Sequence, residues 1–231
     1  MCVTEPVCQN KADIVLALDQ STSIVVEEWG GMQNWEREVL GFAKKITSAF
    51  PIDKTQTQFG VFKFNQGGEV AFDLNRYGDR ESLENAIGKL EIRGGETNLA
   101  AALRTARDMF SPSRGSRPGV HKILILVTDG TANQERSNTL PEAKRTKEAG
   151  IKTYTVGITR KVDQDQLSKV ASNPEYFFYA ENFKELHKVL YDLIKKSCKD
   201  TGRLWSFQYC SRLRPVQLFY SLFTVFLEKG R

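Results

Sequence analysis

The segment KILILV at residues 122–127 is the most apolar run of the chain, and it decides the class of fold. A continuous apolar run of this length is typical of a strand that is buried on both faces of a parallel sheet. The segment ADIVLAL at residues 12–18 has the same character. The two segments therefore predict two central strands of a sheet that helices cover on both sides.

Strand patterns and helical patterns alternate outward from these two runs. Further strands are predicted at 58–64, 69–74, 152–158 and 176–179, and helices at 29–50, 79–90, 98–110, 141–149, 163–171 and 183–196. Turn residues 65–68 separate two of the strands, which are expected to form a hairpin with an antiparallel edge. The predicted fold class is therefore α/β, a doubly wound and mostly parallel central sheet with one antiparallel edge strand and helices on both faces.

Composition and charge limit the classes of function. The chain has 231 residues, 40% of them hydrophobic, which is enough to bury a core. The net charge is +5, but residues 199–231 alone hold six basic and two acidic residues, so residues 1–198 carry only +1. A body without a field of one sign gives no reason to expect nucleic-acid binding.

The residues near the two ends of the sequence predict neither a membrane-spanning helix nor a signal peptide. The longest apolar stretch, at 216–227, is shorter than the roughly 20 residues that a spanning helix needs. The first residues lack a basic region followed by an apolar one, so no signal peptide is visible. The protein is thus expected to be either intracellular or a fragment of a longer secreted chain.

The domain organisation follows from where the periodic pattern begins and ends. We expect a lead-in at 1–10, one α/β domain at 11–198 and a C-terminal tail at 199–231. The tail is rich in arginine and aromatic residues but shows no helical or strand periodicity. It could bind a membrane surface or a partner, although a poorly ordered end is the preferred interpretation.

All four cysteines lie outside the periodic region: Cys2, Cys8, Cys198 and Cys210. They show no CxxC spacing and no nearby histidine, so a zinc site is not expected. Their placement suits a disulfide that joins the ends of one domain. Four unrelated thiols in a reducing compartment are the alternative.

Polar residues follow the central strands and precede one helix. Asp19, Ser21 and Ser23 come after the strand at 12–18, Thr97 comes before the helix at 98–110, and Asp129 comes after the strand at 122–127. Each loop alone could serve as a helix cap. Together the three loops predict an all-oxygen site for a hard cation, Mg²⁺ by preference, with Mn²⁺ or Ca²⁺ as competitors.

The number of charges at this site indicates its use. Two aspartates balance the charge of a divalent ion, and the remaining groups are neutral hydroxyls and water. Such an ion can accept one more anionic oxygen, and a carboxylate on a partner protein could supply it. The site is therefore interpreted as one of recognition.

Three segments resemble the signature segments of von Willebrand factor type A domains: DIVLALDQSTS at 13–23, GGETNLAAAL at 94–103 and ILILVTDG at 123–130. The resemblance covers about residues 8 to 198. It implies a metal-ion-dependent adhesion site in which Ser21, Ser23 and Thr97 reach the metal directly, and Asp19 and Asp129 do so directly or through water. Gln20 replaces the more usual Ser or Ala at a position that is not a ligand.

The resemblance is greatest to members from matrilins, collagen VI and related matrix proteins. It implies a disulfide between Cys8 and Cys198, an extracellular origin, and a matrix or cell-surface partner that presents Glu or Asp. Collagen is a possible partner but is not indicated, because residues 130–140 are too short and too polar for the extra helix of collagen-binding integrin domains. An intracellular type A domain of a multiprotein complex is the alternative.

An enzyme is not expected. The first strand is not followed by GxGxxG, and no GxSxG occurs in the chain. Ser21 stands where a phosphatase of the haloacid dehalogenase type needs a second Asp. The two histidines, His121 and His187, are not placed for general-base chemistry.

Overall fold

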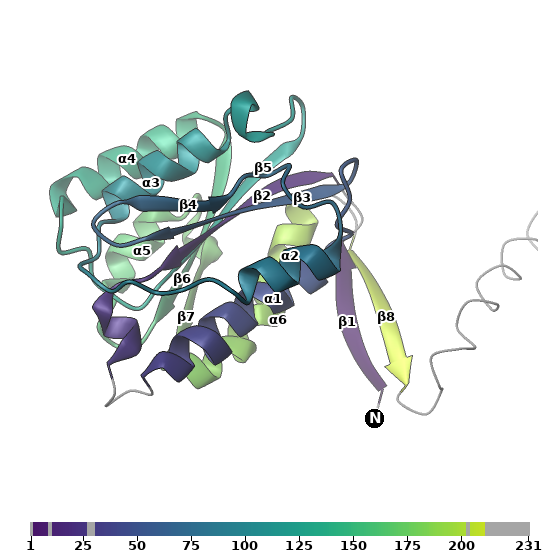
Figure 1. Ribbon diagram of the computed structural model, residues 1–231, viewed down its shortest axis with the longest axis horizontal. Helices are drawn as coiled ribbons and strands as arrows, with labels where there is room; N and C mark the ends of the chain where they lie inside the picture. Colours follow the sequence, from purple (N-terminus) through teal and green to yellow (C-terminus); the bar gives the residue numbers. More distant parts are fainter. Residues whose placement is uncertain (1, 9–10, 27–30, 202–203, 211–231) are drawn as a thin grey trace, which may run out of the picture.

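The fold is built on a six-stranded sheet. The computed structural model describes residues 2–8, 11–26, 31–201 and 204–210, with side chains described for 11–26 and 31–199. The strand order is β4-β3-β2-β5-β6-β7 (Figure 1). The strands are β2 (Ala12–Asp19), β3 (Thr57–Phe64), β4 (Gly68–Phe72), β5 (His121–Thr128), β6 (Ile151–Ile158) and β7 (Phe177–Ala180). All neighbouring strands are parallel except β3 and β4, which confirms the predicted antiparallel edge.

Helices cover both faces of this sheet. They are α1 (Leu40–Ser48), α2 (Arg80–Ile87), α3 (Leu99–Met109), α4 (Arg136–Glu148), α5 (Gln164–Val170) and α6 (Leu186–Thr201). Short helical segments are η1 (Thr22–Val25), η3 (Asn34–Val39), η4 (Pro112–Arg114), η5 (Pro174–Tyr176) and η6 (Phe183–Glu185). Helices α1, α2 and α6 lie on one face, and α3, α4 and α5 lie on the other (Figure 1). The predicted doubly wound α/β class is therefore confirmed.

The unbroken apolar pattern of the central strands follows from this two-sided burial. On β2, Ile14 and Leu16 belong to the core beneath α1 and α6, and Val15 and Ala17 belong to the core beneath α3. Successive side chains of a strand point to opposite faces, so a strand between two helical layers needs apolar residues at every position. Among the side chains that the structure describes, the buried members of the two cores run from residue 12 to residue 198.

Helix α4 begins five residues earlier than the sequence predicts. We expected Pro141 to open this helix, but it lies inside a helix that starts at Arg136. Contacts with residues outside α4 hold this extra first turn in place. The carboxylate of Glu135 accepts hydrogen bonds from Asn98 Nδ2 at 3.0 Å and Arg104 Nη2 at 2.8 Å, and its carbonyl accepts one from the Asn138 amide at 2.8 Å. These contacts compensate for the hydrogen bond that Pro141 cannot donate.

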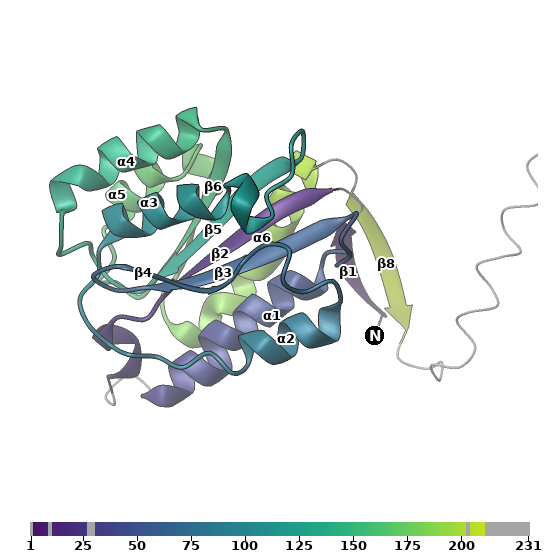
Figure 2. The same cartoon turned by 45° about the horizontal axis from the view of Figure 1, so that its top comes forward.

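The ends of the domain carry a small second sheet that the sequence did not predict. Strands β1 (Cys2–Cys8) and β8 (Leu204–Cys210) pair antiparallel, with Cys2 opposite Cys210 and Cys8 opposite Leu204. Both views show this ribbon at the end of the domain where β2 begins, opposite the carboxyl edge of the sheet (Figures 1 and 2). The expectation of a tail without strand structure is therefore wrong for Leu204–Cys210, and residues 211–231 lie outside the described part of the chain.

The cysteine at the end of α6 is bonded. Cys198 is fully buried and forms a disulfide. Its partner is not among the side chains that the structure describes, so the pairing with Cys8 stays a prediction. Within the described residues, no helix combines the length and apolar character that crossing a bilayer requires.

Candidate metal centre

Three loops meet at the carboxyl edge of the sheet. Strands β2 and β5 are parallel neighbours, with Leu18 opposite Val127, so Asp19 and Thr128 end the two strands side by side. The Thr97 loop joins them through a hydrogen bond from the Thr22 amide to the carbonyl of Gly95 at 2.9 Å. This is the edge at which ligands bind in open α/β sheets.

Asp19 is fully buried and its two carboxylate oxygens are both held. The Ser21 amide donates to Oδ1 at 2.8 Å, and the Thr128 hydroxyl donates to Oδ2 at 2.5 Å. Thr128 is not among the residues predicted as ligands. In the sequence it is a hydroxyl residue at the end of an apolar strand, within the segment 123–130 that resembles a signature of the family.

A chain of hydroxyl groups links the loop after Asp19 to Asp129. Ser21 Oγ and Ser23 Oγ lie 3.0 Å apart, and Ser23 Oγ donates to Asp129 Oδ1 at 2.7 Å. The second carboxylate oxygen of Asp129, Oδ2, is buried and has no hydrogen-bond partner among the residues that the structure describes. A buried, anionic oxygen without a donor is costly unless something else compensates its charge.

Thr97 completes the group beside Gly130. A Cβ atom added at Gly130 would lie 2.9 Å from Thr97 Oγ1 and 3.8 Å from Ser23 Oγ, so only glycine leaves these hydroxyls their space. The Thr97 amide donates to Asn133 Oδ1 at 2.9 Å, and the Asn133 amide returns a bond to the carbonyl of Thr97 at 3.1 Å. The structure thus brings the five predicted residues Asp19, Ser21, Ser23, Thr97 and Asp129 together.

The hydroxyl side of the group opens to solvent through a cavity of about 540 Å³. Its lining includes Ser21, Ser23, Thr97, Gly130 and Lys161. Asp19 and Asp129 lie behind it, because both are fully buried. A ligand in the cavity would therefore meet the hydroxyl groups first and the carboxylates beyond them.

The electrostatics of the site favour a cation. Burial raises the pKa of Asp19 to about 6. Burial, and next the charge of Asp19, raise the pKa of Asp129 to about 7, against the opposing effects of the Ser23 hydroxyl and Lys161. Both ionised carboxylates are unfavourable where they lie, and a divalent cation between them would remove that cost.

The donor set fits a hard divalent ion. In the part of the chain that the structure describes, no three His, Cys, Asp or Glu residues cluster in a way that could hold a metal. The predicted site instead offers two carboxylates and three hydroxyls, which are ligands suited to Mg²⁺ or Mn²⁺. The partnerless Oδ2 of Asp129 and the space kept by Gly130 both fit an ion at this point.

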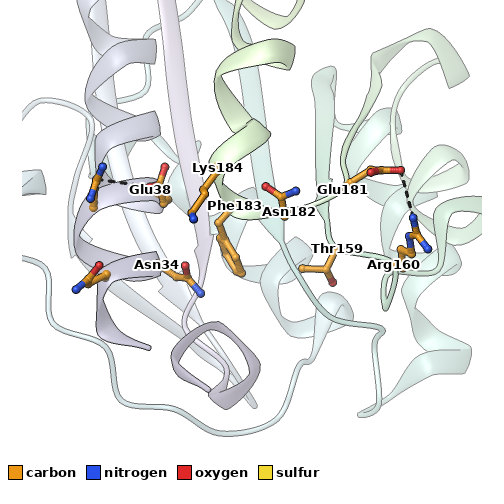
Figure 3. Close-up of a pocket in the computed structure, with 10 residues that line it drawn as sticks. Asn34, Glu38, Thr159, Arg160, Glu181, Asn182, Phe183 and Lys184 are labelled. Carbon is orange, nitrogen blue, oxygen red and sulfur yellow. Dashed lines mark ion pairs between the residues drawn. The ribbon is translucent and has the colours of Figure 1, made fainter. Parts of the chain in front are cut away.

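A larger cavity, of about 870 Å³, lies at the ends of β6 and β7 and contains none of the predicted ligands. Figure 3 shows Thr159 and Arg160 on its wall, with Asn182, Phe183 and Lys184 at the start of the last helix. Its charged residues are largely paired, since Arg160 contacts Glu181 at 3.6 Å and Arg37 contacts Glu38 at 3.7 Å. This cavity is open and polar and does not compete with the three loops as a metal site.

Gly130→Ala should weaken metal binding without unfolding the domain. The new methyl group would lie 2.9 Å from Thr97 Oγ1, and the threonine hydroxyl has to move away from the site to relieve this contact. We expect roughly a 10-fold loss of Mn²⁺ affinity, as for other changes beside metal ligands. Calorimetric titration of Mn²⁺ into wild type and Gly130→Ala measures this loss. Gly41→Ala, where an added Cβ meets nothing within 4 Å, is the matched control, and equal losses in the two variants would contradict the prediction.

The fold and this arrangement of loops define a von Willebrand factor type A domain. Residues 13–192 match the sequence model of the family described as von Willebrand factor type A domain. The chain belongs to this family.

Its relatives include matrix and adhesion proteins. The chain is 32% identical over 220 residues to the human collagen alpha-6(VI) chain, covering 95% of this chain and 9% of that protein. It is 30% identical over 202 residues to the transmembrane cell adhesion receptor mua-3 of Caenorhabditis elegans, covering 85% of this chain and 5% of that receptor. The chain thus spans less than a tenth of either relative.

Solved structures show the same fold. Proximal thread matrix protein 1 from the mussel byssus superimposes with a TM-score of 0.78 at 30% identity, covering 85% of this chain and 50% of that one. Another structure of that mussel protein, with a TM-score of 0.79 at 29% identity and the same coverage, has zinc in its metal-ion-dependent adhesion site. That mussel protein therefore holds a divalent metal ion in this site.

Proposed function

We propose that this domain is a divalent-cation-dependent adhesion module of an extracellular matrix or cell-surface protein. The metal is Mg²⁺ by preference, with Mn²⁺ or Ca²⁺ as alternatives, and Asp19, Ser21, Ser23, Thr97 and Asp129 hold it. A Glu or Asp of the partner supplies a further ligand. The buried Oδ2 of Asp129, which has no partner within a group of hydroxyls, is the observation that carries this proposal.

Neighbouring groups of the chain hold the proposed metal ligands in position. Thr128 and the Ser21 amide orient Asp19, Ser23 orients Asp129, and Asn133 fixes the backbone of Thr97. When bound, the metal supplies a positive charge that can attract a carboxylate oxygen. Lys161, which lines the same cavity, adds a second positive charge for an acidic partner.

A binding role fits the site better than an enzymatic one. Among the residues that the structure describes, no histidine or cysteine lines the 540 Å³ cavity, and hydroxyls without an adjacent base are weak nucleophiles. The relatives named above are a collagen, an adhesion receptor and a thread matrix protein. The module is therefore proposed not to be an enzyme.

An extracellular location is proposed over the intracellular alternative. The disulfide at Cys198 supports it, because the cytosol keeps most thiols reduced. Collagen is still not indicated as the partner. Residues 130–135, between Asp129 and α4, contain no helix, so the extra helix of collagen-binding integrin domains is absent from this described segment.

Capture of partners from a matrix extract tests the adhesion role. The immobilised chain should retain at least one protein in Mg²⁺, release it in EDTA and bind it again when Mg²⁺ is restored. Asp19→Ala should retain none, whereas the control Asp165→Asn, on the exposed face of α5, should behave as wild type. Retention that EDTA and Asp19→Ala leave unchanged would contradict the proposal.

We also propose that residues 11–198 form the self-sufficient domain, with 1–10 as a lead-in and 199–231 as an appended tail. The family match covers residues 13–192, and the strands of the six-stranded sheet run from Ala12 to Ala180, which supports these limits. A chain that ends at Lys199 loses β8 but keeps both cores, so its melting temperature should stay within a few degrees of the full chain. A drop of more than about 10 °C in differential scanning calorimetry would contradict the boundary.

A further inference from the structure

One residue next to the metal centre has a strained backbone. Thr159 follows β6 with φ 72°, and only Glu135 shares a positive φ among the non-glycine residues that the structure describes. Thr159 is 5% exposed. A β-branched residue in the left-handed region is an outlier, and such strain persists only where surrounding contacts hold it.

The contacts of Thr159 join three strand ends. Its hydroxyl donates to the carbonyl of Asp129 at 3.2 Å, and its amide donates to the carbonyl of Ala180, at the end of β7, at 2.9 Å. The Lys161 amide in turn donates to the Thr159 hydroxyl at 3.3 Å. The residue thus ties the loop after β5 to the ends of β6 and β7.

A second threonine makes the reverse connection. The hydroxyl of Thr131, two residues after Asp129, donates to the carbonyl of Lys161, two residues after Thr159. We call Thr131 and Thr159 the threonine clasp, because the hydroxyl of each donates to a backbone carbonyl in the loop that carries the other. The clasp borders Gly130, whose lack of a side chain otherwise leaves this loop free to move.

We propose that Thr159 is a positioning residue for the metal centre, which fixes Asp129 by holding its carbonyl group. This inference rests on the proposed function, since it assumes that Asp129 is a metal ligand. Ser23 restrains only Oδ1 of that side chain, so the direction in which Oδ2 points depends on the backbone to which Thr159 is bonded.

The strained backbone of Thr159 supports a structural role for its hydroxyl group. Glycine would adopt φ 72° without cost but would offer no hydroxyl to Asp129. Retaining threonine there costs backbone energy and keeps one hydrogen bond to the loop that carries Asp129. Thr159→Gly and Thr159→Ala therefore separate the two effects, because both remove the bond and only the first removes the strain.

Titration with Mn²⁺ alone tests the proposal on the full chain. Thr159→Ala and Thr159→Gly should each lose about 3- to 10-fold in Mn²⁺ affinity, the range expected for one hydrogen bond. Thr159→Ser keeps the hydroxyl and should bind within about twofold of wild type. The matched control is Thr155→Ala on β6, whose hydroxyl donates to the carbonyl of Leu167 at 3.0 Å and which should bind Mn²⁺ as wild type does.

Hydrogen exchange of the metal-free protein gives a readout that does not depend on the metal. The Gly130 amide donates to Thr128 Oγ1 at 3.2 Å. It should exchange faster in Thr159→Ala and Thr159→Gly than in wild type, and at the wild-type rate in Thr155→Ala. Because glycine is unstrained at this position, Thr159→Gly should fold even if Thr159→Ala does not.

Two results would overturn the inference in distinguishable ways. If wild type binds Mn²⁺ and Thr159→Gly binds it equally well, the clasp does not position the site, while the proposed function stands. If wild type binds no Mn²⁺, the proposed function and the inference fall together. An equal loss of affinity in Thr155→Ala would also overturn it, because the effect would then be a general loss of stability.

Discussion

Replacing Asp129 by asparagine should abolish divalent-cation binding and should make the metal-free protein more stable at about pH 8. The two buried carboxylates repel each other when no cation lies between them. The asparagine side chain would remove one of the two charges while keeping an acceptor for the Ser23 hydroxyl. We expect a gain of about 1–3 kcal/mol in the free energy of unfolding, together with a loss of more than about 100-fold in metal affinity.

The sign of the pH dependence follows from the two pKa values. The folded pKa values of Asp19 and Asp129, about 6 and about 7, lie above the ordinary value of 3.8. Between these limits the folded metal-free protein binds more protons than the unfolded chain, so its stability falls as pH rises from about 4 to about 7. The gain from Asp129→Asn should therefore be large above about pH 7 and small near pH 4.

Urea unfolding in EDTA measures this effect across the pH range. Asp165→Asn, which alters an exposed ion pair with Lys169 on α5, is the control and should change stability by less than about 0.5 kcal/mol at any pH. An Asp129→Asn variant that is less stable than wild type at about pH 8 in EDTA would show that the two carboxylates do not oppose each other as described.

Replacing Cys198 by serine should destabilise the protein by about 2–5 kcal/mol. The cysteine is fully buried at the end of α6 and forms a disulfide. A bond to Cys8 would close a loop of about 190 residues, which the chain-entropy model values at about 5 kcal/mol. The serine variant also leaves a hydroxyl in a site that packs among apolar residues.

Double substitution shows whether Cys8 is the partner. If Cys8 and Cys198 form one bond, the double variant should lose clearly less stability than the sum of the losses in Cys8→Ser and Cys198→Ser, because each single substitution already removes the same bond. Additive losses would contradict the pairing. So would a mass map of the unreduced, digested protein in which Cys198 is linked to Cys2 or Cys210.

The central strands and the predicted ligands could be read from the sequence because their signals are local. The apolar run at 122–127 is typical of a strand buried on both faces, and β5 confirms this prediction. The helices predicted at 79–90 and 98–110 are also present, and Asp79 and Asn98 each accept a hydrogen bond from a backbone amide of the first turn. The five oxygen residues lie at strand and helix ends, where parallel topology brings them together.

The parts that the sequence missed depend on partners far along the chain. The first turn of α4 is held by Asn98 and Arg104, which lie more than 30 residues before Glu135. Strand β8 depends on β1, at the opposite end of the sequence. Thr159 acts through a single hydroxyl group, and no periodicity or motif marks it before its acceptor is known. Thr128 lies within the segment 123–130, but the sequence does not show that its hydroxyl reaches Asp19.

Calorimetric titration of Mg²⁺ and Mn²⁺ into wild type and Asp19→Ala, at about pH 8, tests the central claim most directly. Both aspartates are ionised in this range, so protonation does not mask binding. The account predicts saturable binding at a single site in wild type and no detectable binding in Asp19→Ala, with both proteins folded. Equal affinity in the two proteins, or no binding by wild type, would contradict it.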